Sequence, residues 1–179
     1  MTDAIAAALA AVDAANAEDP TLVVVRRRQG PKELLHAELV TGWVEQLADD
    51  PSDALRLAAR AHHLQRWRWP RSSYPEGRAG YLRWRRDLHA RHVEALAEVV
   101  DGTGVDPAVV ARAGEIIAKK ALGRDPEVQV LEDALCLVFI ETQYADLAAR
   151  LAPDHMADVA AKTLKKMSPR AQDLAKAFL

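Results

Sequence analysis

Three histidines and two carboxylates have residue types and positions suited to a metal site. We expect His36 to face inward from one helix, and the His62-His63 pair lies toward the end of the next helical segment. Glu132 and Asp133 interrupt the most apolar segment of the chain, where a carboxylate is costly unless it is paired, hydrogen-bonded or bound to a metal. Because imidazole binds zinc, iron, cobalt and nickel, these residues suggest a divalent transition metal as cofactor. The four candidate ligands are His36, His62, His63 and Asp133.

The same residues also allow an interpretation without a metal. The histidines would then be core residues, each hydrogen-bonded to Glu132 or Asp133. The sequence leaves both interpretations open. In an enzyme, His63 or His89 is the candidate general acid or base, because imidazole titrates near neutral pH, and Glu132 or Asp133 would orient it.

A basic segment from His62 to His92 is the second candidate feature. It contains eight arginines and two carboxylates, an excess of six positive charges, whereas the whole chain has a net charge of −2. A basic segment on an acidic body attracts anions, and the planar guanidinium group suits phosphate or carboxylate. The candidate substrate-binding residues are Arg66, Trp67, Arg71, Tyr74, Arg78, Arg85, Lys119 and Lys120.

These features predict binding of a phosphorylated or otherwise anionic small molecule, with hydrolysis or transfer of the anionic group as the reaction in an enzyme. The alternative is a non-catalytic interaction module that uses the Trp/Arg loop of residues 66–85 to bind a protein or RNA partner. The net negative charge argues against a general nucleic-acid binder. A homodimer is left open.

The elements that must position these residues are helices. Alanine and leucine at helical spacing dominate the chain, and Ser or Asp before several apolar segments is typical of helix N-caps. We expect an all-α fold, one domain over residues 1–179, with about eight helices. Their approximate ranges are 3–15, 31–47, 52–65, 81–99, 107–120, 126–151, 153–166 and 168–177. TLVVVRRRQG, residues 21–30, is the one strand-like stretch; we expect a short strand or extended arm there, and no sheet.

Targeting features are few. The first residues lack the basic region of a secretory signal, and no stretch of 18 uncharged apolar residues occurs, so we expect a cytoplasmic protein that does not span a membrane. Cys136 lies in the apolar run LCLVFI, which predicts a buried, inert thiol.

The motif KMSPR, residues 166–170, resembles the ATP-binding signature loop of class I aminoacyl-tRNA synthetases. The chain has no HIGH tetrapeptide and no alternating strand–helix pattern, so we interpret Ser168 as the N-cap of the last helix instead.

Several longer runs of the sequence resemble a known family. The runs PKELL, ARAHHLQRWRWPRSSYPEGRAGYLRWR and KKALGRDPEVQVLEDALCLVFIE resemble the domain-of-unknown-function family 4202 over nearly the whole chain. This resemblance implies a fold and a family, and no activity. It also implies that Gln often stands at position 62, which moves attention to His63, Arg66, Trp67, Arg71, Tyr74, Arg78, Arg85 and His89.

The order of an inward His, a His-led pair and a later Asp also resembles the HD-domain phosphohydrolases. These are all-helical proteins that bind one or two divalent metals through H…HD…D ligands. His63 stands where that family has Asp. Because imidazole is a poor ligand for magnesium, the resemblance implies a transition metal in an HD-like scaffold.

Overall fold

The helices begin where the sequence supplies N-caps. Ser52, Asp106, Asp125 and Ser168 each accept a hydrogen bond from a backbone N–H in the first turn of the helix that follows. The computed structural model describes residues 2–178. Within them the helices are α1 (Asp3–Ala17), α2 (Lys32–Leu47), α3 (Asp53–Ala61), α4 (Gly77–Val99), α5 (Pro107–Ile117), α6 (Pro126–Thr142), α7 (Tyr144–Ala148), α8 (Pro153–Leu164) and α9 (Pro169–Ala175), with two short 3-10 helices, η1 (Arg66–Arg68) and η2 (Arg71–Ser73). The all-α prediction is confirmed for the described residues.

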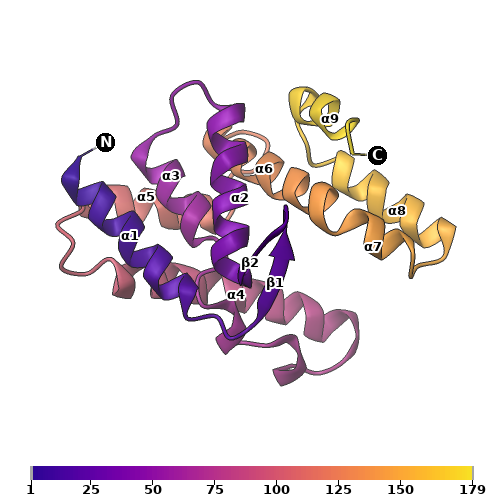
Figure 1. The fold of residues 1–179 in the computed structure, drawn as a ribbon, viewed down its shortest axis with the longest axis horizontal. Helices are drawn as coiled ribbons and strands as arrows, with labels where there is room; N and C mark the ends of the chain where they lie inside the picture. The colour runs from indigo at the N-terminus through magenta and orange to yellow at the C-terminus, as the bar shows by residue number, and fades with distance from the viewer. Residues whose placement is uncertain (1, 179) are drawn as a thin grey trace.

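The core is built around α6. Leu131, Ala134, Leu137 and Val138 are buried on this helix, which packs against α2, α3, α5 and α9. Figure 1 shows α2 crossing in front of α3 and α6, with α7 and α8 continuing from α6 toward one end of the molecule. No helix in the described part of the chain is long and apolar enough to cross a membrane.

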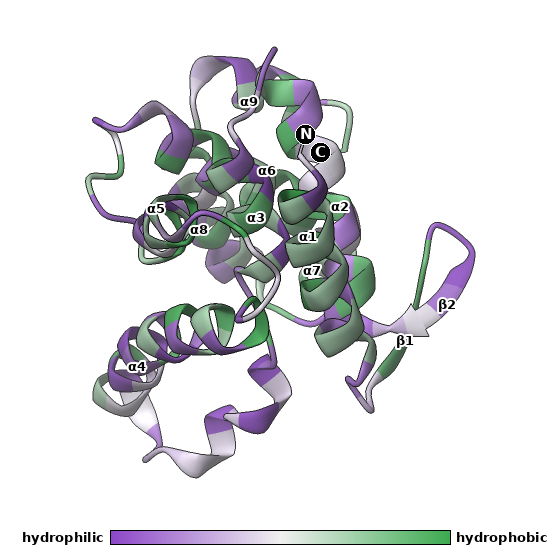
Figure 2. Ribbon diagram, turned by 90° about the vertical axis from the view of Figure 1, so that its left-hand side faces the viewer, coloured by the Kyte–Doolittle hydropathy of each residue, from purple (hydrophilic) through white to green (hydrophobic). Residues whose placement is uncertain are grey.

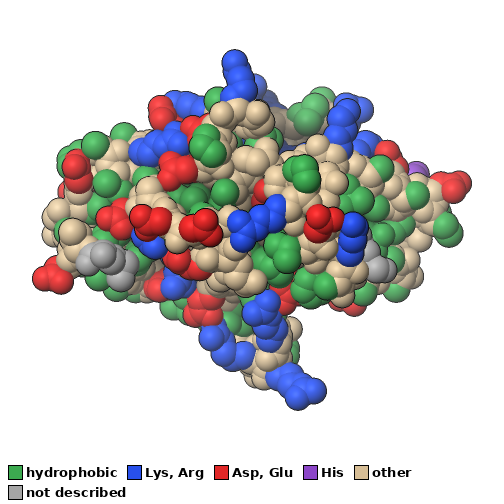
Figure 3. Space-filling view, turned by 90° about the horizontal axis from the view of Figure 1, so that it is seen from above, with side chains coloured by type: hydrophobic (Ala, Val, Ile, Leu, Met, Phe, Trp, Pro, Cys, Tyr) green, Lys and Arg blue, Asp and Glu red, His purple; other side chains and the backbone are tan. Residues whose placement is uncertain are grey.

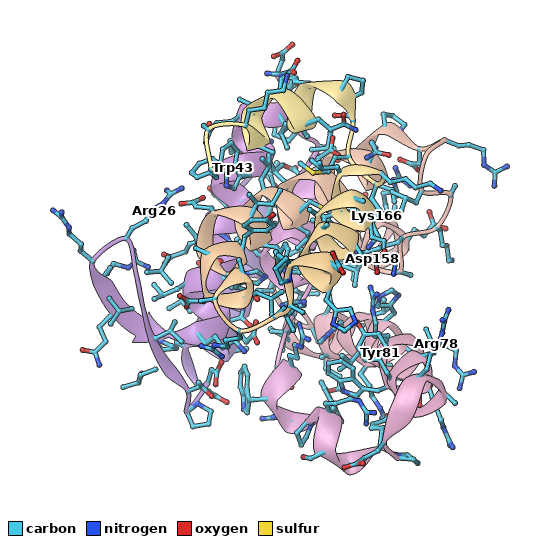
Figure 4. The ribbon with its side chains drawn as sticks, turned by 90° about the vertical axis from the view of Figure 1, so that its right-hand side faces the viewer. Arg26, Trp43, Arg78, Tyr81, Asp158 and Lys166 are labelled. Carbon is cyan, nitrogen blue, oxygen red and sulfur yellow. The ribbon has the colours of Figure 1, made fainter. Side chains whose placement is uncertain are left out.

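A two-stranded antiparallel sheet corrects the prediction that the strand-like stretch forms no sheet. β1 (Leu22–Val25) pairs with β2 (Arg28–Pro31), and Figure 2 shows the hairpin projecting from the body. Arg26 and Arg27, with φ of 49° and 65°, form the two-residue turn. The Nε of Arg26 donates to Glu141 at 2.6 Å, and Glu141 also accepts from Nε1 of Trp43 at 3.0 Å. Figure 4 shows Arg26 on the side of the hairpin that faces Trp43. The bond from Arg26 thus fixes to α6 a turn of a kind that usually contains Gly or Asn.

The loop between α3 and α4 also differs from the expected boundaries. α3 ends at Ala61 instead of about residue 65, and residues 62–65 form a turn in which Gln65 has a left-handed conformation with φ of 55°. α4 begins at Gly77, four residues before the expected start. The indole Nε1 of Trp84 donates to the carbonyl of Trp69 at 2.9 Å and fixes the loop on α4.

Candidate functional site

Three of the predicted metal ligands lie close together, with His62 buried and His36 and His63 partly buried. α2 supplies His36, and the turn after α3 supplies His62 and His63. The ring centroids are 5.0 Å apart for His36 and His62, 4.8 Å for His36 and His63, and 4.3 Å for His62 and His63. One nitrogen atom from each ring lies within 4.8 Å of the other two. We call these three residues the histidine cluster.

Backbone carbonyls determine which ring nitrogen carries the proton in His62 and in the nearby His92. Nδ1 of His62 lies 2.9 Å from the carbonyl oxygen of Ala59, and Nδ1 of His92 lies 2.9 Å from that of Leu64. A carbonyl only accepts hydrogen bonds, so each Nδ1 carries the proton and each Nε2 presents its lone pair. The Nε2 atoms of His36, His62 and His92 are buried and have no hydrogen-bond partner in residues 2–178.

Burial keeps these imidazoles neutral. Burial, together with the smaller effect of the neighbouring cation Arg66, lowers the pKa of His36 and of His92 to about 4. Burial and the neighbouring rings lower the pKa values of His62 and His63 well below the usual range.

Glu33 is a carboxylate beside the cluster that was not predicted from the sequence. It is 3% exposed, and its Oε2 lies 3.3 Å from Nδ1 of His63. Burial raises the pKa of Glu33 to about 7, against the opposing effects of Lys32 and Arg66. The signal was present in the sequence, because Glu33 precedes His36 by three residues and so shares a face of α2 with it.

A cavity of about 380 Å³ lies between α4, α5, α6 and the end of α8. Its lining contains four cations, Arg66, Arg85, Lys119 and Lys166, and no carboxylate among the described residues. Figure 4 shows Tyr81 on the α4 side and Lys166 on the α8 side. The other lining residues are His62, His63, Tyr81, Trp84, Leu88, His89, His92, Ile117, Leu131, Leu135, Cys136, Phe139 and Thr163. We call this space the four-cation cavity.

The two arginines of the cavity have no carboxylate partner in the described chain. The guanidinium group of Arg66 lies over the ring of Trp84, 5.2 Å from its centroid. Among the described residues, this side chain hydrogen-bonds only to His63. Arg85 lies 5.9 Å from the ring centroid of Tyr81. Both side chains are half-buried, and burial lowers the pKa of Arg66. Their charges are therefore partly desolvated, and neither forms a salt bridge with a described carboxylate, although Glu33 offsets part of the charge of Arg66 from a longer distance.

The two lysines of the cavity converge on one buried acid. Lys119 hydrogen-bonds to Oε2 of Glu132, and Nζ of Lys166 lies 3.5 Å from Oε1. Burial alone would raise the pKa of Glu132, but Lys119 and Lys166 outweigh it and the pKa is lowered. Lys119 also has φ of 55°, a left-handed conformation uncommon for a residue with a side chain. The fold thus holds the lysine beside the cavity in a conformation that costs free energy.

Asp133 lies apart from the histidine cluster. Its Oδ1 accepts from Nε2 of Gln129 and from the backbone N–H of Ser168, both at 2.9 Å. Asp133 thereby fixes the start of α9. The four predicted metal ligands are thus divided. The structure brings the three histidines together and places the aspartate at the contact between α6 and the start of α9.

The predicted anion-binding residues are divided as well. Arg66, Arg85 and Lys119 line the cavity together with His63 and His89. Arg71 instead donates to the carbonyls of Tyr74, Pro75 and Gly77, and so stabilises its own loop. The remaining predicted residues do not line the cavity: Trp67, Tyr74, Arg78 and Lys120.

Comparison with protein families places the chain in a known family. The chain belongs to the family described as a domain of unknown function (DUF4202), whose model matches residues 6–178. This match confirms the resemblance to that family. No curated protein and no solved structure matched the chain.

Proposed function

We propose that this member of the family binds a phosphorylated small molecule in the four-cation cavity. The supporting observation is the pair Arg66 and Arg85, whose half-buried charges have no carboxylate partner in the described residues. An uncompensated charge near the protein interior is costly. A phosphate group would neutralise both guanidinium groups and could accept two hydrogen bonds from each.

The shape and lining of the cavity define the class of ligand. About 380 Å³ is within the range of small-molecule sites. Leu131, Leu135 and Phe139 form an apolar wall, and Trp84 lies on the arginine side. A suitable ligand therefore has a phosphate at one end and an apolar or aromatic part at the other.

The same cavity contains a candidate for proton transfer. His89 lines it, and burial, then Lys119 and Arg85, lowers the pKa of His89. The ring is therefore neutral at pH 7 and able to accept a proton. In hydrolysis, His89 would take a proton from the attacking water as the phosphorus–oxygen ester bond breaks, and the leaving oxygen, on the opposite side of phosphorus, would take its proton from solvent. The four cations would offset the negative charge that develops.

One surface supports the interaction module as a second candidate function. Tyr81 and Leu82 are 43% and 54% exposed at the start of α4. Arg78, Arg83 and Arg86 are exposed on the same helix. By contrast, Figure 3 shows acidic and basic side chains interspersed on the face seen from above. This part of α4 is thus the surface of choice for a partner if the cavity binds no small molecule.

Thermal unfolding with a panel of phosphates tests the proposal. The panel contains inorganic phosphate, sugar phosphates, nucleoside monophosphates and phenyl phosphate, each organic phosphate beside its dephosphorylated analogue. A ligand at about 100 times its Kd stabilises the folded state by about 2.7 kcal/mol, which raises the melting temperature by several degrees. The analogues should have no effect. Equal melting temperatures with all phosphates and all analogues would contradict the proposal.

A further inference from the structure

We propose that His36, His62 and His63 bind a first-row transition-metal ion, for which zinc is the leading candidate. This site does not depend on anion binding in the four-cation cavity, and it can be tested in the absence of any phosphate. The proposal follows from the positions of ring nitrogens, their hydrogen-bond partners and their lone pairs.

The spacing of the three nitrogens is close to that of a metal site. They lie within 4.8 Å of one another. Zinc–nitrogen bonds of about 2.0–2.1 Å in a tetrahedron place ligand nitrogens about 3.4 Å apart. The nitrogens must therefore approach one another by up to about 1.4 Å, which side-chain rotations provide.

The partners of the rings are those expected behind metal ligands. Nδ1 of His62 donates to the Ala59 carbonyl, and Nδ1 of His63 faces the buried carboxylate of Glu33 at 3.3 Å. Metal-bound histidines almost always donate their second ring N–H to a carbonyl or a carboxylate. The Ala59 carbonyl leaves Nε2 of His62 free to bind an ion. Oε2 of Glu33 is buried with no hydrogen-bond partner among the described residues, and it would accept from Nδ1 of His63 once Arg66, which now contacts both nitrogens of that ring, has moved.

Packing alone does not account for the cluster. The Nε2 atoms of His36 and His62 are buried with no hydrogen-bond partner among residues 2–178. Each such acceptor lowers the free energy of unfolding, because it has lost its hydrogen bonds to water and gained none in the protein. A bound ion would satisfy both at once, and the carboxylate of Glu33 would offset part of its charge.

One group must move for the ion to bind. Arg66 donates to Nε2 of His63 at 2.7 Å, and this is the atom that the ion would take. Arg66 also lines the four-cation cavity, so its guanidinium can turn toward that space. Metal binding would then release an arginine toward a bound anion.

The ligand set selects the class of metal. Three imidazoles and no ligand oxygen favour zinc, cobalt, nickel or copper, whereas magnesium and calcium require oxygen ligands. Three ligands leave one tetrahedral position for water or an anion. His62 and His63 also line the four-cation cavity, so an ion held by them would lie beside its contents.

Titration of chelator-treated, tag-free protein with Co²⁺ alone, and with Zn²⁺ in competition against a chromophoric chelator, tests the site. We expect one ion per chain and the visible absorption bands of tetrahedral Co²⁺. His36→Asn, His62→Asn and His63→Asn should each weaken binding by at least about 100-fold, and Glu33→Gln by about 10- to 100-fold. His155→Asn is the matched control, because His155 is exposed on α8 and distant in sequence from the cluster.

Circular dichroism confirms that each variant is folded. If a histidine variant unfolds, the cobalt spectrum of the wild-type protein and the effect of Glu33→Gln remain as tests. Absence of stoichiometric binding to the wild-type protein would overturn the proposal, as would unchanged affinity in the folded cluster variants. Arg85→Gln should leave metal binding intact, so failure of the anion site and failure of the metal site give different results.

Discussion

Gly80 on α4 lies so close to Pro75 that a Cβ atom at position 80 would be 1.9 Å from the Pro75 carbonyl oxygen. No side chain fits there without displacement of the loop. Gly80→Ala should therefore lower the free energy of unfolding and separate the loop of residues 66–76 from α4. Urea denaturation measures the first effect, and the rate of limited proteolysis in the loop measures the second.

Gly42→Ala is the matched control. Position 42 is inside α2, and a Cβ there would contact nothing within 4 Å among the described residues. Alanine should raise the free energy of unfolding by about 0.5–1 kcal/mol, because it restricts the unfolded chain more than glycine does. Equal effects of the two substitutions would show that the loop does not approach α4 as described.

Glu132→Gln should change stability and anion affinity in opposite directions. Loss of the carboxylate leaves Lys119 and Lys166 without their shared partner, at a cost of about 1–3 kcal/mol, since both ammonium groups keep some contact with water. The same change adds one net positive charge beside the cavity, so phosphate should bind more tightly. Urea denaturation and calorimetry measure the two effects. A variant with weaker phosphate binding would contradict the assignment of the lysines to the anion site.

Glu132 also predicts a pH dependence. Its pKa is lowered in the folded state, so its contribution to stability is present above the unfolded value of about 4.5 and is lost as pH falls through the folded pKa. The difference in unfolding free energy between wild type and Glu132→Gln should therefore decrease as pH falls from 5 to 3. A constant difference across this interval would mean that Glu132 is not held by the lysines.

Local signals in the sequence predicted most of the helices. Contacts between residues distant in the sequence could not be predicted from such signals. The caps Ser52, Asp106, Asp125 and Ser168 are recognisable because they act within one turn. The hairpin was missed because its turn consists of two arginines, and the bond from Arg26 to Glu141 spans 115 positions of the chain.

The site was predicted in part for the same reason. The helical positions of His36, His62 and His63 identified the histidine cluster. Asp133 was expected to need a partner, and it has two: Gln129 on the same helix and the backbone of Ser168, 35 residues away. Lys166 was not predicted because only the packing of the chain after α8 against α6 brings it to Glu132.

The titration of His89 provides a local test of the cavity. Its pKa lies below 6.5 because the ring is partly buried near Lys119 and Arg85. A bound phosphate would neutralise these cations and should raise the pKa of His89. NMR titration of the ring protons, assigned with His89→Gln, measures the shift with and without inorganic phosphate. An unchanged or lowered pKa at saturating phosphate would place the anion elsewhere.

Cys136 lines the cavity but should be unreactive. Burial, then the nearby charge of Glu132, raises its pKa to about 12, so the thiolate is scarce at pH 8. We expect iodoacetamide to modify this thiol far more slowly in the native protein than in urea. Mass spectrometry of timed samples measures both rates. Rapid modification of the native protein would show that the cavity opens more than the structure indicates.

Calorimetric titration of phenyl phosphate into the wild-type protein and two arginine variants is the most direct test of the proposed function. Arg85 lines the cavity, whereas Arg83, two residues earlier on α4, is exposed and faces Asp87. A charge-assisted hydrogen bond is worth about 1.5–3 kcal/mol, so Arg85→Gln should weaken binding by about 10- to 100-fold and Arg83→Gln should leave it unchanged. No measurable binding to the wild-type protein, or equal effects of the two substitutions, would contradict an anion site in the four-cation cavity.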